Sequence, residues 1–104
     1  MDGSLIRQTT LAMADITRIN LEKINDISKA EKLHEQLEGL LPGAATIEIN
    51  GAAVERIDTS NLQLLVAFTL AAGRHHVQVS LIQPSDALRE AARLTGLTEQ
   101  LGIV

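Results

Sequence analysis

The chain has 104 residues, 45% of them hydrophobic and 21% charged, which suffices for one compact domain but not for two independent cores. Nine basic against thirteen acidic side chains leave a formal net charge of -4, so the sequence lacks the positive surface by which proteins bind nucleic acid or anionic lipid. The absence of cysteine excludes disulfides, a thiolate nucleophile and most structural zinc sites, and it fits a reducing cytoplasm. Phe68 is the one aromatic residue, so the core must be aliphatic.

The sequence indicates a single domain over residues 1–104 that is not inserted in a membrane. Met1 to Arg7 contain no apolar run of signal-peptide length, and we expect no secretion signal. Residues 62–72 form the longest uncharged apolar stretch, about half of the roughly 20 residues that a spanning helix needs.

The first half of the chain predicts two strands and one surface helix. Residues 5–9 are compatible with an edge strand, and residues 16–21 alternate between apolar and polar side chains as a half-buried strand does. In residues 27–41 the apolar side chains recur every three or four positions, which predicts a helix with its apolar stripe facing the core. This stripe consists of Ile27, Ala30, Leu33, Leu37 and Leu41.

The second half alternates strands with helices. Residues 45–49 predict a strand that ends in the Asn50-Gly51 turn signal, and a further strand covers 77–82. Between them, four polar residues from Asp58 to Asn61 precede a helix over about residues 60–72. A final helix begins after Ser85 and ends at Gly96, and Thr98 is expected to cap one last turn.

This order of elements predicts an α/β fold with a mixed sheet of about four strands and helices packed on it. The later strands are separated by helices, which permits parallel crossovers of the usual right hand. The first two strands are joined without a helix, and this connection is the reason to expect a mixed sheet.

The polar run Asp58-Thr59-Ser60-Asn61 is the candidate functional site. It lies where a strand region ends and a helix begins, which is where open α/β sheets usually place their sites. The first N–H groups of a helix are unpaired and carry the positive end of its dipole, so a phosphoryl group on Ser60 or Thr59 suits this position. The alternative is that these residues act as helix caps and nothing more.

The helix over residues 62–72 is apolar nearly all round, with Gln63 and Thr69 as its polar residues. A helix on one side of a small sheet needs one apolar stripe, so part of this surface is available to bind a partner or a second copy of the chain. The alternative is that the C-terminal helix covers it.

The segment from Ala45 to Leu65 resembles the core of a STAS domain, the module shared by sulfate-transporter tails and anti-sigma factor antagonists. In this family a hydrophobic strand is followed by Asp-Ser/Thr-Ser/Ala-Gly-Leu and an apolar helix, and here the motif reads Asp58-Thr59-Ser60-Asn61-Leu62. The likeness continues to Leu97 and covers most of the chain, with its strongest part over residues 16–97.

The resemblance implies a cytoplasmic regulatory protein that binds protein partners and has no reaction or cofactor of its own. In anti-sigma factor antagonists the anti-sigma kinase phosphorylates the serine before the glycine, a position that matches Ser60. In the STAS subunits of phospholipid-transport ABC complexes the hydroxyl residue after the aspartate contacts the ATPase, a position that matches Thr59. A STAS adaptor in a chemotaxis or signalling cluster, working without phosphorylation, is a further alternative.

We therefore expect a partner to bind Asp58, Thr59, Ser60, Asn61, Gln63 and Leu64, with Ser60 and Thr59 as the phosphorylation candidates. Phosphate at this helix start is expected to leave the fold intact and to release the partner. Asn61 departs from the family pattern, since glycine is usual there, and its side chain is expected to hinder a kinase that approaches Ser60.

The sequence does not favour a metal site or an enzyme. His75 and His76 are neighbours at the expected start of a strand, so their rings should face opposite sides of the sheet, and His34 has no ligand-like neighbours. No Ser-His-Asp order, glycine-rich phosphate loop or nucleophile elbow is recognisable.

Overall fold

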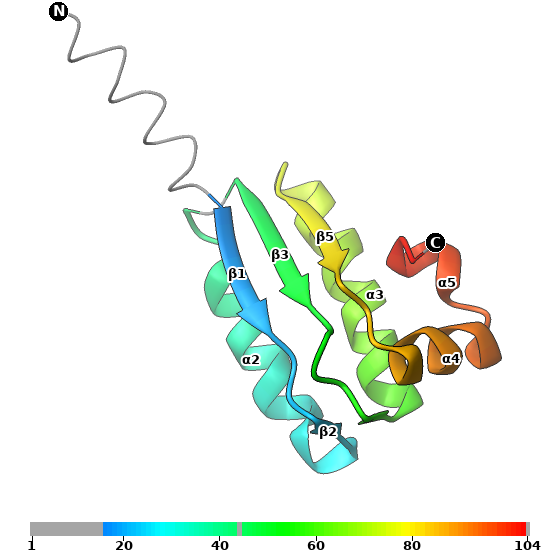
Figure 1. Cartoon of the computed structure of the whole chain (residues 1–104). Coiled ribbons are helices and arrows are strands. Elements are labelled where there is room, and N and C mark those ends of the chain that lie inside the picture. The colour runs from blue at the N-terminus through cyan, green and yellow to red at the C-terminus, as the bar shows by residue number, and fades with distance from the viewer. Residues whose placement is uncertain (1–15, 44, 104) are drawn as a thin grey trace, which may run out of the picture.

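The computed structural model describes residues 16–43 and 45–103. Short parallel strands alternate with helices along this part of the chain (Figure 1). The elements are β1 (Ile16–Asn20), β2 (Ile24–Asn25), the 3-10 turn η1 (Ile27–Lys29), α2 (Ala30–Leu40), β3 (Thr46–Asn50), β4 (Arg56–Ile57), α3 (Thr59–Arg74), β5 (Gln78–Ile82), α4 (Asp86–Thr95) and α5 (Thr98–Leu101).

The main sheet has the strand order β1-β3-β5, and its described strands pair in parallel. The register aligns Ile19 with Ile49 and Ile49 with Leu81, which places these three aliphatic side chains in one row. A second parallel pair, β2 with β4, follows β1 and β3 in the chain. Helices α2 and α3 lie side by side against one face of the main sheet (Figure 1).

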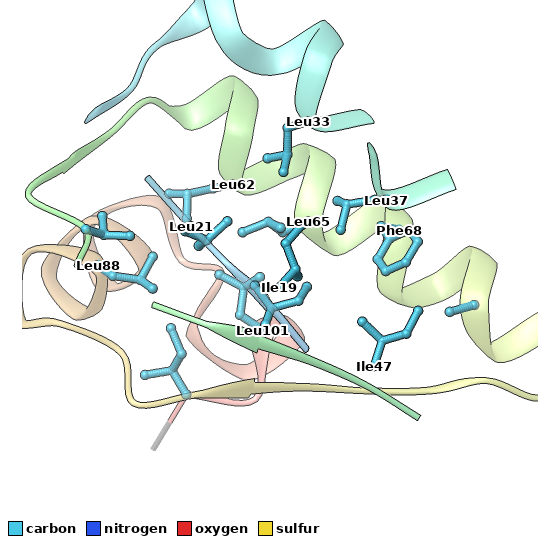
Figure 2. Packing of buried hydrophobic residues seen from close by; sticks show 14 of the residues in the cluster. Ile19, Leu21, Leu33, Leu37, Ile47, Leu62, Leu65, Phe68, Leu88 and Leu101 are labelled. Atoms are coloured by element: carbon cyan, nitrogen blue, oxygen red, sulfur yellow. The ribbon is translucent and has the colours of Figure 1, made fainter. Parts of the chain in front are cut away.

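The core fills the space between α2, α3 and this face of the sheet (Figure 2). It is aliphatic apart from Phe68, as the composition requires. Its fully buried large side chains include Leu37, Ile47, Leu62 and Leu65. Each such side chain contributes roughly 1.5–3 kcal/mol by its removal from water, so this cluster is the main stabilising element of the fold.

The expected α/β class, with helices packed on a sheet, is confirmed. The strands expected over residues 16–21, 45–49 and 77–82 are confirmed as β1, β3 and β5. The expected edge strand over residues 5–9 lies outside the described residues, and so does the connection that led us to expect a mixed sheet. The short β2–β4 pair is an addition that the sequence did not indicate.

The prediction for residues 27–41 is wrong at its start. The α-helix begins at Ala30, and Ile27 lies in the preceding 3-10 turn with 72% of its surface exposed. The cause is local: the side chain of Asp26 accepts a hydrogen bond from Ser28 N and caps the short turn. Leu33 and Leu37 do face the core as predicted.

The last two helices follow their sequence signals closely. Ser85 caps α4, since its Oγ accepts a hydrogen bond from Leu88 N at 3.1 Å, and Gly96 ends the helix in the left-handed conformation at φ 73°. Thr98 is the first residue of α5 rather than its cap, a position that Leu97 takes.

Candidate functional site

The residues predicted to bind a partner lie at the start of α3, directly after β4. Hydrogen bonds from Asp58 and Asn61 join this helix start to the segment that leads from β2 into η1. Two stretches of chain 31 to 36 residues apart in sequence thus share one end of the molecule (Figure 1). This is the carboxyl end of the parallel strands, the usual place for a site in an α/β fold.

Asp58 occupies the N-cap position of α3, but its carboxylate does not cap that helix. Instead, Oδ2 accepts a hydrogen bond from the backbone N–H of Ile27 at 3.0 Å. Asp58 N in turn donates to the carbonyl of Asn25 at 2.9 Å. The interpretation that Asp58 serves as a helix cap is therefore wrong for its side chain, which instead fixes the neighbouring turn.

The two candidate hydroxyl residues differ in accessibility. Thr59 is exposed at the first position of α3. The Oγ atom of Ser60 is buried and has no hydrogen-bond partner among the described residues. Thr59 is therefore the more accessible of the two hydroxyl residues.

Asn61 is fully buried, with 0% of its surface exposed. Its Nδ2 donates to the carbonyls of Asn25 and Asp26, each at 2.9 Å. The side chain therefore offers a partner no contact surface, contrary to the prediction, and does not project into the path of a kinase. Asn61 is also the third residue of α3 with no positive φ, so the glycine usual at this position is not required by the backbone.

Gln63 is exposed, and Leu64 is half-buried in a groove between α2 and α3. This groove has a volume of about 220 Å³ and is lined by His34, Glu38, Leu41, Leu64, Ala67, Phe68, Ala71 and Arg74. Elsewhere α3 is covered by β5, α4 and α5, while Leu70 keeps 63% of its surface exposed. Neighbouring elements thus cover most of the apolar helix and leave a strip that includes Leu70 exposed, and binding of a partner to this strip stays a prediction.

Three polar residues that support the site, Asn25, Asp26 and Ser28, were not predicted from the sequence. Asn25 is buried and donates from Nδ2 to the carbonyl of Glu22 at 2.6 Å. Asp26 accepts hydrogen bonds from the backbone N and the Oγ of Ser28. The pair Asn25-Asp26 directly precedes the segment predicted as a helix, and nothing in the local sequence links it to residues 58–61.

The environment of Asp26 favours its ionised form. The side-chain hydrogen bond from Ser28 lowers the pKa of Asp26 below its ordinary value of 3.8, and the backbone hydrogen bond from Ser28 acts in the same direction. The positive charges of Lys29 and Arg56 lower this pKa further. Asp26 therefore carries a full negative charge beside Ile27 at neutral pH.

The histidines do not gather into a metal site within the described chain, where no group of three or more potential ligands is arranged to hold an ion. His34 pairs with Glu38 on α2 at 3.3 Å. His75 and His76 lie in the turn between α3 and β5, not in the strand itself, and His76 adopts φ 61°. None of the described helices is long and apolar enough to span a bilayer.

Comparison with known proteins identifies the family. A family model described as "Mlab, STAS domain" matches residues 9–104, and the chain therefore belongs to the STAS family. Among curated proteins, no sequence matches.

Two solved structures share the fold. One is the NMR structure of the protein TM1081, with a TM-score of 0.73 at 21% identity, covering 86% of this chain and 74% of that one. The other is the anti-sigma factor antagonist SpoIIAA in its unphosphorylated form, with a TM-score of 0.70 at 18% identity, covering 82% of this chain and 76% of that one. The expected STAS resemblance is thus confirmed.

Proposed function

We propose that this chain is a regulatory interaction module of the anti-sigma factor antagonist type, in which a protein partner docks on the start of α3 and phosphorylation there releases it. The proposal includes a cytoplasmic location and no reaction of the chain's own. The observation that carries it is the exposed Thr59 at the first position of a 16-residue helix whose N-cap carboxylate is turned toward Ile27.

The charge balance at this end of α3 supports a switch that leaves the fold intact. Because Asp58 makes no side-chain cap, the helix start retains its preference for negative charge. A phosphate on Thr59 would therefore be tolerated by the folded chain. In a desolvated interface, however, nearly two added negative charges beside Asp58 are costly, so the partner should dissociate.

Ser60 and Thr59 have different roles in this proposal. Ser60 occupies the position that is phosphorylated in anti-sigma factor antagonists, but its Oγ is buried here. A kinase would reach it after the first turn of α3 opens, whereas Thr59 needs no such opening. We therefore place the modification on Thr59 first and on Ser60 second.

A second candidate function is a STAS subunit that docks on the ATPase of a phospholipid-transport ABC complex. The description of the matching family model as "Mlab, STAS domain" favours it, and so does the exposed Thr59, because the matching residue of those subunits contacts the ATPase. In this case the same surface binds the partner constitutively and no phosphate is added.

Affinity purification from the native host, followed by phosphosite mass spectrometry, separates the two functions. Wild type, Thr59→Glu and Ser60→Asp would serve as baits. If the switch is correct, wild type retains a kinase-type partner and Thr59→Glu does not. Mass spectrometry should then find phosphate on residue 59 or 60. Recovery of a transporter ATPase with both hydroxyls unmodified would reject the switch in favour of the second candidate.

A further inference from the structure

Ile27 is the most exposed large hydrophobic residue in the described chain, at 72% of its surface. A single exposed aliphatic side chain is common and needs no explanation by itself. Ile27 differs from the other exposed aliphatic residues because its backbone N–H donates a hydrogen bond to the side chain of Asp58 at the start of α3.

Three consecutive residues, Asn25, Asp26 and Ile27, are tied to the start of α3. Two carbonyls, those of Asn25 and Asp26, each accept a hydrogen bond from Asn61 Nδ2 at 2.9 Å. At the third residue, Ile27 N donates to Asp58 Oδ2 at 3.0 Å. The donor Asn61 is fully buried, so its two bonds are shielded from competition by water, whereas the bond between Ile27 and Asp58 is exposed. The turn is therefore preorganised before any partner arrives.

We propose that Ile27 is an apolar anchor on the same docking surface as Thr59, and that Asn61 and Asp58 are positioning residues that hold it there. The inference rests on the function proposed above. The occupant is the protein partner of Thr59, which must offer an apolar pocket for a branched aliphatic side chain. Preorganisation of an anchor removes part of the entropy cost of binding and suits a fixed pocket.

Charge argues for a protein pocket and against a membrane surface at Ile27. Asp26 accepts a hydrogen bond from Ser28 N and Asp58 accepts one from Ile27 N, so two carboxylates lie near the Ile27 backbone, together with the positive charges of Lys29 and Arg56 that act on Asp26. These local charges offset one another, and the formal net charge of -4 over the whole chain disfavours a negatively charged lipid headgroup layer. Continuity with Thr59, which follows Asp58 directly in the chain, assigns Ile27 and Thr59 to one partner.

Site-specific photo-crosslinking in the native host tests the inference. The photoreactive amino acid would replace Thr59, Ile27 or, as a control, Leu94 on α4, which is 70% exposed and thus matches Ile27 in accessibility. We expect the probes at residues 59 and 27 to trap the same protein and the probe at residue 94 to leave it free.

Each other outcome has a distinct meaning. If residue 59 traps a protein that residue 27 does not, or if all three probes trap it equally, the Ile27 anchor is rejected while docking at Thr59 stands. If residue 59 traps nothing, the proposed function itself fails and the anchor with it.

Binding measurements with the trapped protein then test the role of Asn61. Ile27→Ala should weaken binding at least about tenfold, whereas Leu94→Ala should change it less than about twofold. Asn61→Gly should weaken binding in wild type but add nothing in the Ile27→Ala background, because a positioning residue acts through the anchor. Equal effects of Asn61→Gly in both backgrounds would show a general structural role and overturn the assignment. A urea unfolding curve of each variant confirms that it is folded during the measurement.

Discussion

The carboxylate of Asp58 accepts a hydrogen bond from the backbone N–H of Ile27, with 3.0 Å between Oδ2 and N. An acidic residue at the start of a helix commonly caps that helix, but here it joins the helix to a turn 31 residues earlier in the chain. The family's acidic residue thus has a structural task in this protein, and Thr59 beside it stays exposed.

Replacing Asn61 should destabilise the fold. Asn61→Ala removes the donor to two carbonyls, those of Asn25 and Asp26, in a place that water does not reach. We expect a loss of about 1–3 kcal/mol in the free energy of unfolding. Urea denaturation followed by circular dichroism measures it. Gln63→Ala, at an exposed position of the same helix, is the matched control, and an equally small change in both variants would show that the two bonds stabilise nothing.

The two faces of α3 should respond differently to truncation. Leu65 is 1% exposed in the core, so Leu65→Ala should cost about 2–5 kcal/mol by lost burial and the cavity that remains. Leu70 lies five residues further along the helix with 63% exposed, and Leu70→Ala should change stability by less than about 0.5 kcal/mol. Thermal and urea unfolding of the pair provide the comparison. A large loss in Leu70→Ala would show that a second copy of the chain covers this strip.

The stabilisation from Asp26 should depend on pH. Since folding lowers the pKa of Asp26 below 3.8, its ionised form favours the folded state. This contribution is fully present above about pH 3.8 and declines as the pH falls through the lowered pKa. The stability difference between wild type and Asp26→Asn should accordingly be larger at pH 6 than at pH 3, in urea titrations at about those two values. A difference that does not change with pH would argue against the Ser28 hydrogen bonds as its source.

A negative charge at residue 59 should not unfold the protein. Thr59 is the first residue of α3, where the dipole of the helix favours an acidic side chain. Thr59→Glu should therefore keep the stability of wild type or raise it by about 0.3–1 kcal/mol in low salt. A calorimetric melt tests this. Substantial destabilisation would mean that added charge acts through unfolding and not through the docking surface.

Much of the fold could be predicted from the sequence, because strands and helices that bury one face in the core have apolar residues at regular spacings. Alternation marked β1, β3 and β5, and the cap at Ser85 together with Gly96 marked the ends of α4. Helical spacing gave a wrong result at Ile27, which lies three residues before Ala30 in the apolar series but belongs to a turn capped locally by Asp26. Periodicity reports which residues could share a face and does not report where local hydrogen bonds start a helix.

The site could be located from the sequence, but its interior could not. The motif at residues 58–61 reads as four exposed polar residues, and this is correct for Thr59. Asn61 is buried because Asn25, 36 residues earlier, provides a carbonyl acceptor, and no local pattern records such a contact. The polar character of Ser60 likewise did not indicate that its Oγ is buried.

Docking of a partner on the start of α3, and its release by negative charge there, can be tested by one affinity comparison. The protein that wild type retains from its host would be titrated with wild type, Thr59→Glu and Gln78→Glu. Gln78 is exposed at the start of β5, so the last variant adds the same charge at a place outside the proposed surface. We predict at least about tenfold weaker binding for Thr59→Glu and unchanged binding for Gln78→Glu. If Thr59→Glu binds as tightly as wild type, negative charge at the start of α3 does not release the partner.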